Sequence, residues 1–179
     1  TATPIPRTMA LSVYGDLDVS SIRHLPPGRQ PVGTYAVGRN MLARIYWFMK
    51  KEMNMGHQVY VVCPLVEESE KADLAAAVSV YEELRTKQFP EFCLGLVHGQ
   101  MKAREKDEVM EAFVQGKIQM LVATSVIEVG VNVPNATIMF IYGADRFGLS
   151  QLHQLRGRVG RGKAKSYCIL YSDNTSEAA

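Results

Sequence analysis

Residues 151–166, with the sequence QLHQLRGRVGRGKAKS, place several cationic side chains among glycines. Guanidinium groups match phosphate oxygens with two parallel hydrogen bonds, and an arginine presented across an interface can stabilise the charge on a transferred phosphoryl group. Arg156, Arg158 and Arg161 cannot all face one direction on an ideal helix, but the intervening glycines allow the backbone to turn and approach a neighbour closely. The spacing therefore allows two interpretations, an arginine finger and a solvated basic loop.

A nucleotide phosphate loop is excluded for the same stretch. Residues 157–164, GRVGRGKA, match the pattern G-x-x-x-x-G-K, but Ala164 stands where a hydroxyl is needed to hold magnesium. The segment also follows a helical pattern and precedes a strand, whereas a phosphate loop follows a strand and opens a helix. Because the sequence also lacks an acidic D-E-x-[HQ] box, we expect half of a nucleotide site and no ATP hydrolysis by this chain alone.

Apolar runs rich in β-branched residues alternate with segments of helical period, which predicts an α/β fold with a doubly wound parallel sheet. The runs are nearly continuous, as expected for strands covered by helices on both faces. The predicted strands are residues 58–64, 92–99, 118–124, 137–143 and 166–172, and the predicted helices are residues 40–55, 70–88, 102–115 and 149–158.

The predicted sheet brings polar residues together, because ligands of open parallel sheets lie beyond the carboxyl ends of the strands. His98 and Gly99 follow one strand, Thr124 and Ser125 follow another, and residues 143–146 follow a third. We expect all of them at one edge of the sheet.

Composition favours one main domain. A chain of 179 residues with 47% hydrophobic content can bury one good core. Residues 24–38, rich in proline and glycine, are predicted to be a linker; residues 1–23 are then the tail of a preceding domain, and residues 39–179 form the main one. A net charge of +2 gives no global field, so any polyanion site must be local.

Other features suit a soluble protein of a reducing compartment, here the cytoplasm. No stretch is apolar enough for a membrane span, and no signal peptide is evident. Cys63, Cys93 and Cys168 each lie in an apolar run and are expected to be reduced core thiols; no metal site is expected. Trp47 lies in a helical pattern and is expected in the core rather than as a base-stacking platform.

The whole chain resembles the second half of a superfamily 2 helicase motor, and within that group it is similar to the RecG family of branched-DNA helicases. Transcription-repair coupling translocases share several of the matching segments, but GDLDVSSIRHLPPGR and CPLVEESE favour the RecG family. The segments occur in the order of the family: TATPIPRT, YGDLDVSSIRHLPPGRQP, QVYVVCPLVEESE, LVHGQMK, VATSVIEVGVNVPNA and DRFGLSQLHQLRGRVGRG.

The resemblance implies a RecA-like fold of the P-loop NTPase type and a site shared between two such domains. ATP would lie at their interface with Mg²⁺ held by the first domain, while the second domain supplies arginines. It also assigns roles to residues. Thr1 and Thr3 would couple the nucleotide state to DNA movement. Arg158 and Arg161 would be the finger arginines at the γ-phosphate, and Gln154 would be a coupling residue near it. The residues near the ribose would be Glu128, Gly130 and Asn132, and those that contact DNA would be His98, Gly99, Thr124 and Ser125.

Two positions depart from the family pattern. Asn132 stands where Asp is usual, and an amide offers one acceptor and two donors in place of a carboxylate's acceptors. Nucleotide affinity or sugar preference is therefore open to change. Asp145 replaces a more usual Glu and alters only the reach of the same charge.

For the whole protein the resemblance implies an ATP-dependent, monomeric motor that remodels forks and Holliday junctions in recombination and repair. Its further partner would be a wedge domain of the same protein. Two alternatives stay open from the residues: a duplex translocase of the transcription-repair coupling type, and a non-catalytic RecA-like DNA-binding module.

Overall fold

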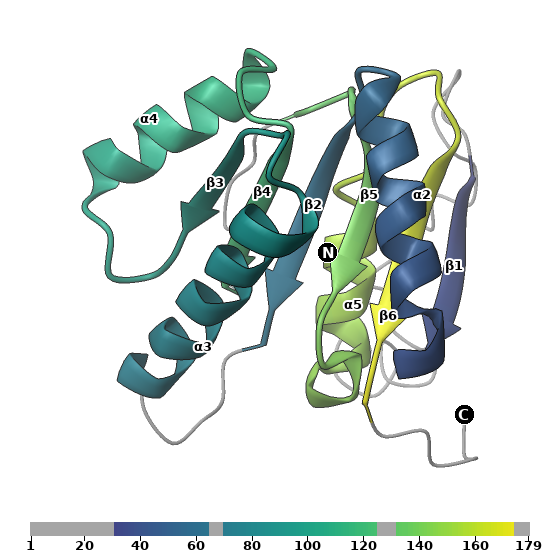
Figure 1. Ribbon diagram of the computed structural model, residues 1–179, viewed down its shortest axis with the longest axis horizontal. Helices are drawn as coiled ribbons and strands as arrows, with labels where there is room; N and C mark the ends of the chain where they lie inside the picture. The colour runs from purple at the N-terminus through teal and green to yellow at the C-terminus, as the bar shows by residue number, and fades with distance from the viewer. Residues whose placement is uncertain (1–30, 65–69, 125–131, 174–179) are drawn as a thin grey trace, which may run out of the picture.

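A single parallel sheet organises the part of the chain that the structure, a computed structural model, describes, namely residues 31–64, 70–124 and 132–173 (Figure 1). The strand order is β1-β6-β5-β2-β4-β3, and every pair is parallel. The strands are β1 (Val32–Val37), β2 (Gln58–Cys63), β3 (Leu94–Val97), β4 (Met120–Thr124), β5 (Ala136–Ile141) and β6 (Ser166–Tyr171).

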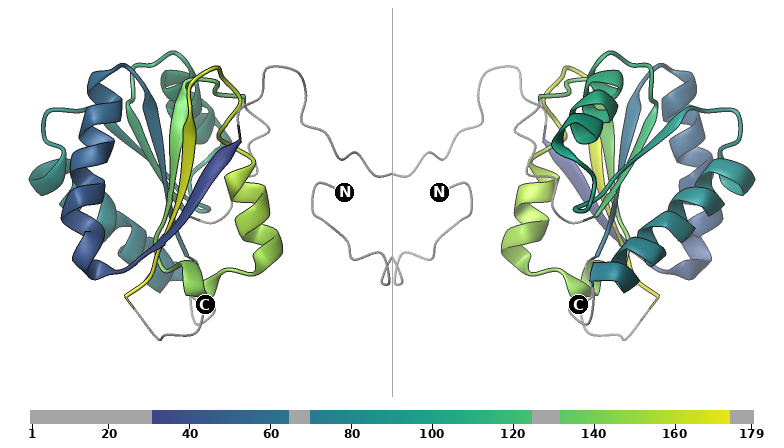
Figure 2. Two further views of the ribbon diagram at one scale, coloured as in Figure 1. Left: turned by 90° about the vertical axis from the view of Figure 1, so that its right-hand side faces the viewer. Right: turned by 90° about the vertical axis from the view of Figure 1, so that its left-hand side faces the viewer.

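Helices cover both faces of the sheet (Figure 2). Within β2, Val59 and Val61 face the core beneath α2 and α3, whereas Tyr60 and Val62 face the core beneath α4 and α5. The helices are α2 (Leu42–Asn54), α3 (Glu70–Glu83) continued by a π-helical turn (Leu84–Gln88), α4 (Ala103–Val114) and α5 (Leu149–Arg156), with short 3-10 turns at Arg39–Met41 and Ala144–Arg146. The predicted doubly wound sheet is confirmed.

All five predicted strands and all four predicted helices are present, with ends that differ by a few residues. The sixth strand, β1, was not predicted. It occupies residues 32–37 and pairs with β6, so the expected linker over 24–38 is wrong for that part, while residues 1–30 lie outside the described residues. As an edge strand, β1 has three consecutive exposed residues, and this removes the continuous apolar run by which the other strands are recognised.

Two expectations about the core are wrong. Trp47 is 64% exposed. The buried face of α2 is formed by Ile45, Tyr46, Met49 and Met53, and Trp47, which follows Tyr46, lies outside that face. Cys93 is exposed in the turn before β3, whereas Cys63 and Cys168 are buried; all three are free thiols. Among the described residues, no helix is long and apolar enough to cross a membrane.

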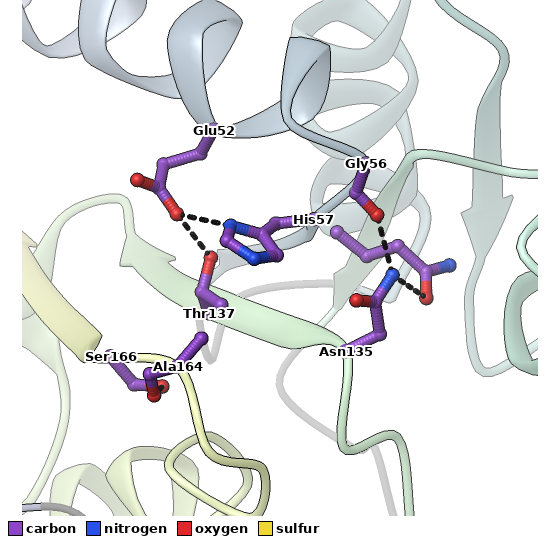
Figure 3. A network of polar contacts seen from close by, with 8 residues as sticks. Glu52, Gly56, His57, Asn135, Thr137, Ala164 and Ser166 are labelled. Atoms are coloured by element: carbon purple, nitrogen blue, oxygen red, sulfur yellow. Dashed lines mark hydrogen bonds and ion pairs between the residues drawn. The ribbon is translucent and has the colours of Figure 1, made fainter.

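A buried carboxylate joins the end of α2 to the start of β5 (Figure 3). Glu52, 6% exposed, accepts a hydrogen bond from the Thr137 hydroxyl at 2.9 Å, and His57 Nδ1 lies 2.8 Å from the same carboxylate oxygen. Nearby, the Asn135 amide donates to the Gly56 carbonyl at 2.6 Å. These contacts hold the amino ends of β2 and β5 together, at the edge opposite the strand-end candidates His98 and Thr124.

We predict that Glu52→Ala lowers the free energy of unfolding of the chain by about 2–3 kcal/mol, because the buried Thr137 hydroxyl loses a charged acceptor. Urea denaturation followed by far-ultraviolet circular dichroism measures the change. Thr137→Val, which removes one partner and leaves the His57 contact, should cost less, about 1 kcal/mol. An unchanged urea midpoint in Glu52→Ala would contradict the structural role given to this carboxylate.

Candidate functional site

The arginine-rich segment forms a turn directly after α5. The helix closes as the Gly157 amide donates to the His153 carbonyl at 3.0 Å, and Gly160 then adopts a φ of 76° that favours glycine. Val159 is fully buried and anchors the turn in the core beneath α4 and α5. The backbone of the arginine-bearing turn is therefore held rigidly while its cationic side chains extend from it.

Two of the three arginines act on the same buried group. Burial raises the pKa of the Tyr60 phenol to about 12, and both Arg158 and Arg161 partly oppose that rise. Arg156 instead acts on Cys168 of β6, whose pKa burial raises to about 11. Arg158 and Arg161 therefore both act on Tyr60 of β2, whereas Arg156 acts on Cys168 of β6.

Arg161 is also fixed by its own turn. Its Nε donates to the Gly157 carbonyl at 3.1 Å, and both Arg158 and Arg161 are half-buried. Gln154 is exposed in the last turn of α5, and Arg158 and Arg161 follow in the turn just after the helix ends.

Gly162 is in direct contact with the segment that carries Asn132. A Cβ atom at position 162 would lie 2.3 Å from the Pro134 carbonyl oxygen, closer than any real Cβ contact. The close backbone approach that the glycines predicted is therefore present here. Asn132 is exposed two residues before Pro134, so the candidate ribose contact and the candidate finger lie on neighbouring stretches of backbone.

The carboxyl ends of the strands bring two candidate DNA contacts side by side. Val97 of β3 pairs with Ala123 of β4, so His98 and Thr124 come at the same level of the sheet. Gly99 follows His98 and is exposed, whereas Thr124 is buried at 4% exposure. The predicted common edge is confirmed for these residues.

The turn after β3 is braced against α4. Lys106 Nζ donates to the Gly99 carbonyl at 3.0 Å, and the Lys102 amide donates to the Glu105 carboxylate at the start of the helix. Among the residues that the structure describes, none is a hydrogen-bond partner for the buried His98 Nδ1. Burial lowers the pKa of the imidazole, with the Lys106 cation acting in the same direction and Glu105 opposing it. Burial and the Lys106 cation thus both favour the neutral form of the His98 ring.

Residues 143–146 lie at the same edge. Gly143 has a φ of 54°, which favours glycine, and Ser172 donates to the Asp145 carboxylate at 2.8 Å. A cavity of about 210 Å³ opens there beside Tyr142 and Pro64. The carboxyl edge thus carries both polar groups and open space.

Several expected site residues lie outside the described residues. These are Thr1, Thr3, Ser125, Glu128 and Gly130.

The start of α4 carries the basic residues Lys102 and Arg104. The side chain of Arg104 is 90% exposed and pairs with Glu108 at 2.9 Å, which is the arrangement of a solvated helix end. In the described ranges, no group of three or more His, Cys, Asp or Glu side chains is placed to hold a metal ion.

Two residues near the site were not predicted from the sequence. Tyr60 stands in the apolar run QVYVVC, and nothing in that run indicates that two arginines act on its phenol. Lys106 is one of several charged residues on α4, and only the fold shows that its ammonium group reaches the Gly99 carbonyl. The contact of Tyr60 with the arginines joins segments far apart in the chain, and that of Lys106 spans the turn between β3 and α4; spacing alone reveals neither.

Comparison with known proteins gives one family model, "Helicase conserved C-terminal domain", which matches residues 39–163. The chain is 55% identical over 177 residues to the ATP-dependent DNA helicase RecG of Bacillus subtilis, covering 99% of this chain and 26% of that protein. It is 51% identical over 178 residues to the protein of the same name from Thermotoga maritima, covering 99% of this chain and 23% of the relative.

Among solved structures, one titled "Structure of RecG bound to three-way DNA junction" matches with a TM-score of 0.78 and 46% identity, covering 98% of this chain and 22% of that one. Domain 2 of the DEAD-box helicase Mss116p, solved with an RNA duplex, matches with a TM-score of 0.58 and 14% identity over 78% of this chain and 53% of that one, which supports the fold alone. The chain spans about a quarter of the length of its curated relatives.

Proposed function

Since the chain belongs to the family of helicase conserved C-terminal domains, we propose that it is the second motor domain of an ATP-dependent DNA helicase that remodels branched DNA. The observation that carries the proposal is the turn after α5: buried Val159 and the close contact of Gly162 with Pro134 fix its backbone, and its Arg158 and Arg161 both act on Tyr60. In this proposal the residues 24–30 lead from a first RecA-like domain into the sheet described above.

The arginine turn suits a nucleotide phosphate. The two guanidinium groups offer only hydrogen-bond donors to an anion that approaches the end of α5. The Gln154 amide adds two donor hydrogens and one acceptor oxygen. Arg158 and Arg161 would contact the γ-phosphate of ATP, Gln154 would couple that contact to movement, and Asn132, with Glu128 and Gly130, would approach the ribose. ATP with Mg²⁺ supplies a phosphoryl group for transfer to water, and the magnesium would be held by the first motor domain.

This chain's residues act on that reaction by charge. When the two motor domains close, the guanidinium groups of Arg158 and Arg161 would offset the negative charge that develops on the phosphoryl oxygens. They require no proton transfer, because a guanidinium stays protonated at every relevant pH. Opening of the domains would withdraw both arginines, and Thr1 and Thr3 would pass that change to the DNA.

The carboxyl edge suits the DNA backbone. The proposed contacts are His98 and Gly99, which follow β3, and Thr124 and Ser125 at the end of β4. The register of the sheet supports this, because Val97 pairs with Ala123 and His98 therefore comes level with Thr124. Hydroxyl and backbone donors hold phosphates without reading sequence. Each cycle of closure would move this edge along the strand, so that hydrolysis drives translocation.

Branched DNA is proposed as the substrate because the relatives named RecG are similar over nearly the whole chain, and one of them was solved on a three-way DNA junction. A wedge domain elsewhere in the protein would separate the strands. The motor would act as a monomer in the cytoplasm, at the bacterial nucleoid.

The test is DNA-stimulated ATP hydrolysis by the full-length protein with no DNA, with plain duplex and with a three-way junction. We expect the junction to stimulate turnover more than the duplex of equal length does. Equal stimulation by the duplex would favour a translocase of the transcription-repair coupling type, and no turnover on any DNA would favour a non-catalytic binding module. The 179-residue chain alone is expected to hydrolyse no ATP.

A further inference from the structure

A groove lies between α2 and the edge strand β1, far from β3, the strand that His98 follows. Its volume is about 290 Å³, and its lining includes Tyr35, Val37, Ile45, Trp47, Phe48 and Tyr167. We call it the aromatic groove. Because β1 and β3 form opposite edges of the sheet, the aromatic groove is separate from the proposed DNA contacts after β3 and β4 (Figure 1).

Aromatic rings are unusually accessible in this groove. Trp47 is 64% exposed and Tyr35 is 51% exposed. The Tyr35 and Tyr167 rings lie 6.4 Å apart at 34°, and Phe48 packs edge-on against Tyr167 at 5.0 Å. Gly33 gives the Tyr35 ring room, since a Cβ there would lie 3.0 Å from its Cε2 atom. The result is a supported platform of ring faces open to solvent.

Cations border the same rings. Lys51 Nζ lies 5.9 Å from the centre of the Trp47 ring, Lys165 Nζ lies 5.6 Å from the centre of the Tyr167 ring, and Arg44 lines the groove. In the described part of the chain no ion pair joins any of these three cations to a carboxylate. No Asp or Glu occurs between Asp18 and Glu52 or between Asp145 and Asp173, the two stretches of sequence that carry these cations.

Two other cation–ring pairs on the same protein are different. Lys50 over Phe89 pairs with Glu91 at 3.2 Å, and Arg85 over Tyr81 pairs with Glu82 at 3.0 Å. Their charge is neutralised within the protein. The charge at the aromatic groove is not neutralised in this way, so an anionic partner would find both rings and cations available.

We propose that the aromatic groove binds single-stranded DNA, with bases stacked on Trp47 and Tyr35 and phosphates against Arg44, Lys51 and Lys165. Exposed rings interleaved with cations are the two elements by which proteins hold single strands without reading sequence. Stacking on ring faces uses the apolar floor of the groove, and the cations meet the backbone. An acidic peptide would use the cations but has less need of the open ring faces.

This inference rests on the proposed function, because it gives a place to a strand separated from a duplex. It adds a second DNA contact at the β1 edge of the sheet, whereas the strand-end contacts follow β3 and β4 at the other edge. The two contacts can be tested apart, since Trp47 is the only tryptophan in the sequence and lies in the groove.

The experiment titrates the 179-residue chain with an oligothymidylate of about 12 nucleotides, within the range of single-strand site sizes. Trp47 fluorescence reports occupation of the groove, and anisotropy of a labelled oligonucleotide reports total binding. We expect quenching of Trp47 with the same midpoint as the anisotropy change. Tyr35→Ala should weaken binding about tenfold, by loss of one stacked base.

A double variant, Lys51→Ala with Lys165→Ala, tests the charge. Removing two phosphate contacts should lower the slope of log K against log salt by about 1.4, since each contributes about 0.7 on single strands. Arg85→Ala is the matched control, because it removes a cation from a ring elsewhere on the surface, and it should leave both readouts unchanged.

Binding without quenching of Trp47, with full affinity in the double variant, would overturn the inference and leave the strand-end contacts and the proposed function intact. Quenching by an oligoglutamate peptide but not by the oligonucleotide would overturn it in favour of a protein partner. Absence of any oligonucleotide binding would also overturn it. Loss of junction-stimulated ATP hydrolysis in the separate assay concerns the proposed function alone.

Discussion

Arg161→Ala in the full-length protein is expected to lower the kcat of DNA-stimulated ATP hydrolysis by about 10³-fold or more, the range found when an arginine finger is removed. The side chain is half-buried and held by the Gly157 carbonyl, so its guanidinium group is oriented before a phosphate arrives. Orientation before binding is what allows a fixed charge to act on the transition state without reorganisation. Arg158→Ala is expected to have an effect of the same order.

Three comparisons separate this role from a structural one. Arg156→Ala removes a neighbouring arginine that acts on Cys168 rather than on Tyr60, and it should change kcat by less than about threefold. Thermal unfolding of Arg161→Ala should match that of the parent protein. Arg161→Lys should recover little activity, because an ammonium group lacks the planar fork of donors. A loss below about tenfold in Arg161→Ala would contradict the finger assignment.

The sheet could be predicted from the sequence because five of its strands are continuous apolar runs covered on both faces. Strand β1 breaks that rule. Its residues Thr34, Tyr35 and Ala36 are exposed at the edge of the sheet, and its flanking glycines and prolines resemble those of a linker. An edge strand is identified by its pairing with β6, which depends on a segment more than a hundred residues away.

The sequence names candidate residues for the site but does not show how they are arranged. The motif around Arg158 and Arg161 indicated phosphate chemistry, yet spacing alone left a solvated loop open. The fold brings Arg158 and Arg161, but not Arg156, within electrostatic reach of Tyr60. Trp47 shows the reverse case, because its apolar character predicted burial while the turn of α2 directs it outward into the aromatic groove.

Gly162→Ala is expected to have the second large effect, on stability and activity together. The added Cβ would lie 2.3 Å from the Pro134 carbonyl oxygen and 3.2 Å from its carbon. Both are backbone atoms, so no side chain can rotate to relieve the clash, and the Arg161 loop or the Asn132 segment must move. Overpacking of this kind costs about 1–3 kcal/mol, and a displacement of about 1 Å at a catalytic group can lower kcat about 10²-fold.

Gly157→Ala is the matched control for this prediction. Gly157 has a φ of −68°, and its nearest atom to an added Cβ is the Gln154 carbonyl oxygen at 3.4 Å, an ordinary contact. An alanine there should keep or slightly raise the melting temperature and leave ATP hydrolysis near the parent rate. Differential scanning calorimetry and the junction-stimulated ATPase assay read both effects. If Gly162→Ala unfolded at the parent temperature with full activity, the close contact between the two segments would not be what positions Arg161, and the rigidity of the turn would have to come from Val159 alone.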